Sequence, residues 1–262
     1  MAANTTRRYS APALEKGIDV VELLAGARLP MGLSEIASAL KRSKSEIFRV
    51  LRVLEARGYI VRERESDRYR LTNKLFVTGL RQPPVAELLD VAYPEMRHLA
   101  AAIRQSCHLS VPSGERMVTV ARVEGPGEVS FMLRVGYGVL IALSASGRVY
   151  LASLPEGERA SWLARLQGKD LAERLLLIRR RGYELAPSAM VVGVTDVSFP
   201  LVDADGAVVA CLAAPLIRRH GEKQDRGAIL ETMRAVAGRI SAALRAAQGA
   251  AAKVSVSYRR TT

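Results

Sequence analysis

The feature that most constrains the fold is residues 43–58, SKSEIFRVLRVLEARG, which have the spacing of an amphipathic helix. Ser43 and Glu46 form an S-x-x-E capping box at its start, and Gly58 marks its end. The opposite face of the helix is polar and basic, and it carries Ser45, Arg49 and Arg52. At about 100° per residue, the apolar side chains fall within about 60° of one another, and they are Ile47, Val50, Leu51 and Leu54. The basic face is either an ordinary solvated surface or one that touches an anionic partner.

The segments around this helix favour the anionic partner. Two further helices are predicted before it, over residues 12–25 and over the short stretch 32–40, GLSEIASAL. The tight turn KRSK joins the second helix to the third. Two short β segments follow at 59–64 and 68–72, joined by a turn. Three helices and an arginine-rich hairpin predict a winged helix-turn-helix over residues 10–80.

Charge indicates what such a domain would bind. The chain carries 39 Lys and Arg residues against 26 Asp and Glu residues, a net charge of +13. Residues 1–82 hold 16 of the basic and 9 of the acidic residues, a net charge of +7. Such an excess indicates nucleic acid or an anionic membrane surface. No apolar run approaches the ~18–20 residues of a membrane helix. Because the basic helix follows a tight turn and precedes a basic hairpin, double-stranded DNA is the expected partner.

The major groove of DNA admits one helix, and guanine accepts a bidentate arginine. The candidates for contacts with base edges are therefore Ser45, Arg49 and Arg52. A helix N-terminus and a basic wing suit the phosphates. The phosphate candidates are Lys44, Arg62, Arg64 and Arg68, extended by Lys41 and Arg42 in the turn, and Ser43 at the helix start is a further DNA-binding candidate.

A second part of the chain begins after Gln82-Pro83-Pro84. A linker helix is predicted over residues 81–104, where Pro94 either kinks it or starts a new helix. Its apolar stripe serves either a dimer contact or packing on its own domain. The pattern over residues 105–249 predicts an α+β domain. Residues 250–262 are predicted to form a disordered basic tail. Strands are expected at CHLSVPSG, MVTVARVEG, VSFMLRVG, VTDVSFPLVD and AVVACLAAPLI, with helices at 144–153, 156–166, 170–181 and 225–247.

No enzyme, metal or cofactor is expected. Cys107 and His108 are adjacent, so in a strand they point to opposite faces and make a poor catalytic or metal-binding pair. Both are interpreted as structural. No G-x-S-x-G, P-loop or zinc-binding histidine pattern occurs. Two cysteines in apolar contexts fit a reducing cytoplasm better than a disulfide framework.

The chain resembles the IclR family of bacterial transcription regulators from about Tyr9 to Gly249. The resemblance rests on LEKGIDVVELLA, LSEIASALKRSKSEIFRVLRVLEARGYI and YRLT, and further on ARVEGP, RVG, ASGR, IRRRGYEL and FPLVDADGAVVACL. It implies a winged helix-turn-helix, a linker helix and a GAF-like α/β effector-binding domain, assembled as dimers or dimers of dimers. Two positions in the third helix depart from the family pattern. Glu46 replaces a small hydroxylated residue, and either closes the cap or reads a cytosine; Phe48 presses on a thymine methyl or packs against the wing.

The resemblance also implies the lining of an effector site: Phe131, Val139, Ala145, Ser146, Val194, Asp196, Ala213 and Pro215. Ala213 and Pro215 stand where serines are common in the family, so Asp196 is the one strongly polar group. A second buried negative charge beside Asp196 would be costly. The expected effector is therefore apolar and either neutral or amine-bearing. In the alternative, Asp196 pairs with an arginine such as Arg134 and touches no ligand.

Together these features predict a homo-oligomeric regulator that binds a palindromic operator, a repressor of a catabolic or transport operon that responds to a small molecule. The rival hypothesis is an enzyme or ligand-sequestering protein whose basic N-terminus is a non-specific nucleic-acid docking module.

Overall fold

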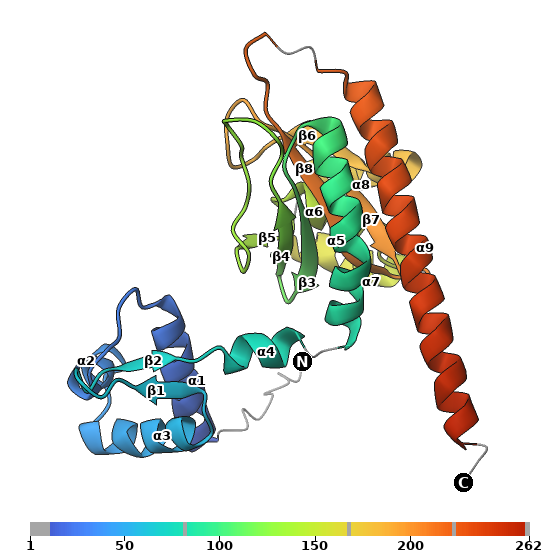
Figure 1. Ribbon diagram of the computed structural model, residues 1–262. Helices are drawn as coiled ribbons and strands as arrows, with labels where there is room; N and C mark the ends of the chain where they lie inside the picture. Colours follow the sequence, from blue (N-terminus) through green and yellow to red (C-terminus); the bar gives the residue numbers. More distant parts are fainter. Residues whose placement is uncertain (1–10, 81–82, 167–168, 222–223, 260–262) are drawn as a thin grey trace, which may run out of the picture. The chain divides into compact units, whose positions relative to one another are not determined.

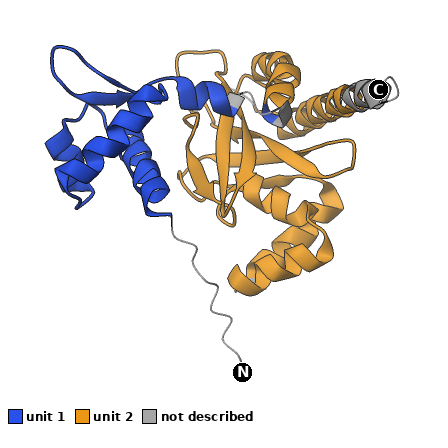
Figure 2. Cartoon of the chain, turned by 90° about the horizontal axis from the view of Figure 1, so that it is seen from below, with its two compact units in different colours: residues 1–85 blue, residues 86–262 orange. Residues whose placement is uncertain are grey.

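A computed structural model describes residues 11–80, 83–166, 169–221 and 224–259 (Figure 1). The chain divides into two compact units, residues 1–85 and 86–262, which are coloured separately in Figure 2. The first unit is mainly helical, and the second combines a sheet with helices, as the predicted α+β class requires. No described helix is long and apolar enough to cross a membrane.

The first unit is a winged helix-turn-helix. Its three helices are α1 (Pro12–Gly26), α2 (Leu33–Ala39) and α3 (Lys44–Ala56), and its wing is the antiparallel pair β1 (Ile60–Arg62) and β2 (Tyr69–Leu71). Met31 adds an isolated bridge to Tyr69. A buried cluster joins the helices to the wing: Val20, Leu24, Ile36, Ala37, Ile47, Leu51, Ile60 and Tyr69. The wing is therefore fixed to the helices by the core of the unit.

The turn between α2 and α3 is closed by backbone hydrogen bonds. Arg42 N donates to the carbonyl oxygen of Ala37, and Lys41 N donates to that of Ser38. This is the Schellman pattern, and Lys41 occupies its left-handed position with φ 52°. The chain then enters α3 at Ser43, as the capping box predicts.

The second unit contains a six-stranded sheet in the order β5-β4-β3-β8-β7-β6, and every neighbouring pair is antiparallel. The strands are β3 (Cys107–Ser113), β4 (Arg116–Val123), β5 (Gly138–Leu140), β6 (Glu184–Pro187), β7 (Thr195–Val202) and β8 (Val208–Leu216). Helices α5 (Pro83–Ile103) and α9 (Arg226–Arg259) cover one face, whereas α6 (Ala145–Ser153), α7 (Glu156–Leu166) and α8 (Lys169–Arg181) cover the other (Figure 1).

The linker helix is one continuous element, α5, with Pro94 inside it. Leu88, Ala92, Met96 and Leu99 are buried in the core that α5 shares with the sheet and α9. The apolar stripe therefore packs on its own unit, which is one of the two uses the sequence left open.

Several elements differ from the sequence prediction. Ser130–Arg134, in the predicted strand VSFMLRVG, form no strand, and only Gly138–Leu140 pair with β4. The short helix α4 (Lys74–Leu80) and strand β6 were not predicted. Helix α9 extends from Arg226 to Arg259, and the disordered basic tail expected over residues 250–262 stays a prediction.

Candidate functional site

The exposed face of α3 carries cations with few partners of their own. Ser45, Arg49 and Arg52 are all exposed, and their spacing of four and three residues places them on one side of the helix. Among the described residues, no carboxylate lies within 4.0 Å of Arg49, whereas Arg52 lies 3.7 Å from Glu55. Phe48, beside them, is 44% exposed. Arg49 is therefore the most available cation of the predicted base-contact set.

The wing arginines differ in how far they are engaged. Arg62 pairs with Asp67 at 2.9 Å, and Arg64 is exposed. Arg68 donates to both carboxylate oxygens of Glu35 and to the carbonyl oxygen of Pro30. Arg68 thus ties the wing to α2 and the segment before it. Of the predicted phosphate contacts, Arg68 is the most committed to a role within the protein.

The contacts at the N-terminus of α3 distinguish the two interpretations of Glu46, closure of the capping box and contact with a cytosine. Its carboxylate accepts hydrogen bonds from the backbone and side chain of Ser43 and from Lys16. The Lys16 and Ser43 hydrogen bonds lower the pKa of Glu46 to about 2. The prediction that Glu46 closes the capping box is therefore confirmed, and the carboxylate is engaged with the protein rather than free to read a cytosine. Lys44 is exposed beside the cap, as are Lys41 and Arg42.

The second unit contains a small cavity of about 50 Å³ between the sheet and the start of α6. It is lined by seven of the eight residues that the resemblance implies for an effector site: Phe131, Val139, Ala145, Ser146, Asp196, Ala213 and Pro215. The eighth, Val194, does not line the cavity. Its carbonyl oxygen accepts a hydrogen bond from the backbone of Ser188, so Val194 positions a loop whose residues Ser188 and Met190 do line it.

One wall of this cavity was not predicted from the sequence. His108, Ser110, Met117 and Thr119, from β3 and β4, complete the lining together with Leu133, Leu143 and Ser144. The expectation that Cys107 and His108 point to opposite faces is confirmed, because Cys107 lies in the α5–α9 core and His108 faces the cavity. The alternation of His108 and Ser110 in CHLSVPSG was the available signal for this wall.

Asp196 is the acidic group of the cavity. Burial raises the pKa of its carboxyl, while a hydrogen bond from Ser188 and the positive charge of Arg148 oppose that rise. The arginine that acts on Asp196 is thus Arg148 and not Arg134, which is exposed.

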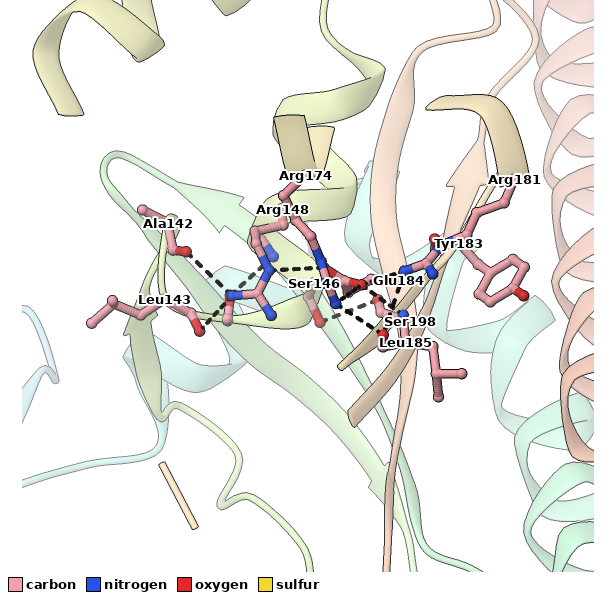
Figure 3. Close-up of polar contacts among 12 residues, drawn as sticks. Ala142, Leu143, Ser146, Arg148, Arg174, Arg181, Tyr183, Glu184, Leu185 and Ser198 are labelled. Carbon is pink, nitrogen blue, oxygen red and sulfur yellow. Dashed lines mark hydrogen bonds and ion pairs between the residues drawn. The ribbon is translucent and has the colours of Figure 1, made fainter. Parts of the chain in front are cut away.

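Arg148 belongs to an ion cluster next to the cavity. Glu184 is completely buried, and it accepts hydrogen bonds from the guanidinium groups of Arg148, Arg174 and Arg181, which converge on it in Figure 3. Arg148 also donates to the carbonyl oxygens of Ala142 and Leu143. Its three partners hold the segment that enters α6 against β6.

Among the described residues, no group of three or more His, Cys, Asp or Glu side chains is arranged to hold a metal ion. The two cysteines are unpaired and buried, and burial raises the pKa of each thiol to about 12. They are therefore poor nucleophiles.

Comparisons with known proteins identify relatives of both units. Residues 13–64 match the IclR helix-turn-helix domain, and residues 84–242 match the C-terminal domain of the bacterial transcriptional regulator IclR. The chain is 31% identical over 200 residues to a glycerol operon regulatory protein of Streptomyces griseus, covering 73% of this chain and 79% of the relative. It is 27% identical over 221 residues to the regulator KdgR of Dickeya chrysanthemi, covering 79% and 72%.

Solved structures share the fold. The IclR protein of Thermotoga maritima matches with a TM-score of 0.71 and 25% identity, over 88% of this chain and 98% of the other. An IclR homologue from Microbacterium hydrocarbonoxydans, solved with 4-hydroxybenzoate, matches with a TM-score of 0.77 and 23% identity, over 89% and 99%.

Proposed function

Because the chain belongs to the IclR family of bacterial transcriptional regulators, we propose that it represses an operon by binding a palindromic operator as an oligomer, and that a small effector in the second unit controls this binding. The observation that carries the proposal is the exposed face of α3, where Arg49 has no carboxylate partner among the described residues. A guanidinium left free in this way can form a bidentate contact with guanine O6 and N7.

The palindrome follows from symmetry. Two copies related by a two-fold axis present two α3 helices, so the half-sites repeat in inverted order, spaced by whole turns of DNA. In this arrangement Arg49 and Arg52 contact bases, Lys44, Arg62 and Arg64 contact phosphates, and Arg68 holds the wing in place. Similarity to the transcriptional repressor AllR of Salmonella and to the glycerol operon regulatory protein of Streptomyces griseus supports repression of a catabolic or transport operon.

The effector site is the cavity beside α6. The homologue solved with 4-hydroxybenzoate supports a small organic effector. In this chain, however, Asp196 faces the cavity and its hydrogen-bonding neighbour is Ser188. A carboxylate placed beside Asp196 would add a second buried negative charge. The proposed effector is therefore neutral or amine-bearing, and Asp196 accepts its hydrogen bond.

The effector changes DNA binding only by as much as its affinity differs between the DNA-competent and incompetent states. Its binding acts on the segment 142–148 and α6, which Arg148 connects to β6.

Selection of bound sequences from a random duplex library tests the DNA-binding proposal. We expect the full chain to enrich an inverted repeat, and sedimentation of the complex to give at least two chains per duplex. Arg49→Ala should enrich a relaxed sequence at the positions that Arg49 contacts, whereas Arg180→Ala, on an exposed position of α8, should enrich the same repeat as wild type. Failure of wild type to enrich any sequence would contradict the proposal and favour a non-specific docking module.

A further inference from the structure

Two polar atoms in the wall of the cavity have no hydrogen-bond partner. They are Nδ1 of His108 and Oγ1 of Thr119, and among the described residues they are the buried side-chain nitrogen and oxygen atoms without one. His108 is 6% exposed and Thr119 is 1% exposed. Buried polar groups in native proteins are nearly always hydrogen-bonded, and an unpaired one is unfavourable. Both residues line the cavity, so a molecule inside it can supply the missing partners.

The sheet places this pair at one end of the cavity. His108 on β3 lies beside Ala213 on β8, whose methyl group offers no hydrogen bond. Thr119 on β4 lies opposite Ser110 on β3, so Thr119 stands two residues along the sheet from His108. Asp196 lies beside Pro215, on the far side of β8. The cavity therefore has polar groups at two ends, separated by β8.

The register gives the distance between these ends. Asp196 and His108 are two strands apart and offset by two residues. A strand spacing of about 4.8 Å and a rise of about 3.4 Å per residue put their Cα atoms roughly 12 Å apart. Both side chains line the same cavity, so one small ligand with a polar group at each end can contact both.

The hydrogen-bonding groups of His108 and Thr119 favour a neutral group on the ligand. Burial lowers the pKa of His108 to about 4, so the imidazole is neutral at physiological pH and presents one donor and one acceptor. The hydroxyl of Thr119 also donates and accepts. An ionised carboxylate would meet no cation here, because the described residues that line the cavity include no Lys or Arg. A hydroxyl group, which both donates and accepts, matches the pair.

We propose that His108 and Thr119 bind the hydroxyl end of the effector, and that the effector is a small amino alcohol or diol whose second polar group donates a hydrogen bond to Asp196. This inference rests on the proposed effector site and extends it to a second group of residues and a ligand class. A cavity of about 50 Å³ has room for roughly three to five water molecules, which a ligand of this size would displace.

Three matched probes test the ligand class on the full chain: 4-aminobutan-1-ol, butane-1,4-diol and 4-hydroxybutanoate. Their binding is measured by calorimetry and by the shift in Tm. We expect the amino alcohol to bind most tightly, the diol next and the carboxylate least. Equal or tighter binding of 4-hydroxybutanoate, or no binding of any probe, would overturn the proposal.

Matched variants test the two residues. Thr119→Val keeps the shape and removes the hydroxyl, so we expect it to weaken binding of 4-aminobutan-1-ol roughly tenfold and to raise the Tm of the free protein. His108→Leu should weaken binding by a similar factor. The control Thr78→Val, on α4, should change neither quantity. An unchanged Kd for Thr119→Val, with a lower Tm, would mean that the hydroxyl has a structural role and would overturn the proposal.

The two proposals fail separately. If Asp196→Asn abolishes probe binding while Thr119→Val and His108→Leu do not, the effector site is supported but the proposed role of His108 and Thr119 is overturned. If the probes bind as expected but no DNA sequence is enriched, the ligand site stands and the regulator function does not.

Discussion

Two groups of arginines show how the same side chain takes different roles in the two units. On the exposed face of α3, Arg49 has no carboxylate partner among the described residues, and Arg52 has a distant one. In the second unit, Arg148, Arg174 and Arg181 share Glu184, which is fully buried. An arginine without a carboxylate on an exposed surface is available to an external anion, whereas arginines around a buried carboxylate maintain the fold.

Sequence motifs alone do not separate these roles. Arg68 lies in a basic wing, yet it donates to Glu35 and Pro30 and behaves like the second group. The distinction comes from the partner of each guanidinium, and variants that remove the partner or the arginine separate the two groups.

The largest effect is expected for Glu184→Gln. This change leaves three guanidinium groups around a neutral amide, and breaking a buried ion pair costs about 3–5 kcal/mol. We expect the free energy of unfolding of the second unit to fall by that amount in urea titrations. Glu173→Gln, at an exposed position on α8, is the matched control. A Tm within about one degree of wild type would contradict the structural role of the cluster.

Removal of His108 should change how stability depends on pH. The pKa of His108 falls from 6.5 to about 4 on burial, so between those pH values the unfolded chain binds a proton that the folded chain does not. Folding stability is therefore lost as pH falls from 6.5 to 4, by about 3 kcal/mol at 1.36 kcal/mol per pH unit.

The difference between wild type and His108→Leu in urea titrations isolates this effect from other titrating groups, Asp196 included. A difference that does not change between pH 7 and pH 4 would contradict the neutral, buried imidazole.

A smaller effect, on DNA affinity rather than stability, is expected for Arg49→Ala. Losing a bidentate contact with guanine costs about 1–3 kcal/mol of binding free energy. Because Arg49 is exposed, the free energy of unfolding should stay within about 0.5 kcal/mol of wild type. Arg68→Ala should show the reverse pattern, with stability reduced by up to about 1 kcal/mol and a smaller loss of affinity. Equal losses of affinity for the two variants would break the distinction between free and engaged arginines.

The smallest effect is expected for Ser43→Ala at the N-terminus of α3. Loss of an N-cap side chain costs about 1 kcal/mol of stability. The pKa of Glu46 should also rise from about 2, because Ser43 donates to its carboxylate. A carbon-detected NMR titration measures the pKa, with Ser45→Ala as the control. An unchanged pKa would mean that Lys16 alone holds Glu46 ionised.

Local signals predicted the first unit well. The Ser43–Glu46 capping box, the glycine at 58 and the apolar periodicity all act within a few residues, so the sequence defines α3 and its exposed face without reference to the rest of the fold. The resemblance to the IclR family is confirmed. The pairing of Arg68 with Glu35, 33 residues away, was not predictable because it depends on how the wing folds back.

The second unit was predicted less completely, because its cavity depends on contacts between residues that are far apart in the sequence. His108 and Thr119 come from a local hairpin of β3 and β4, but they line a cavity with Asp196 only because β3 pairs with β8, which lies far along the chain. The strand expected at VSFMLRVG has the right apolar pattern, but a strand also requires a partner, and β5 pairs only at residues 138–140. The predicted effector residues came from the resemblance to the family. Because Val194 does not line the cavity, the resemblance locates the site correctly but does not identify every side chain that lines it.

The most direct test of the DNA-binding account is fluorescence anisotropy of the full chain on duplexes from upstream of its own gene, with scrambled duplex as competitor, across a salt series. The account predicts tight binding that survives the competitor, with log K falling by about 0.9 per phosphate contact for each unit of log salt. It also predicts weaker sequence preference for Arg49→Ala. Equal and weak binding to every duplex, unchanged by Arg49→Ala, would contradict it and would reduce the exposed face of α3 to an ordinary charged surface.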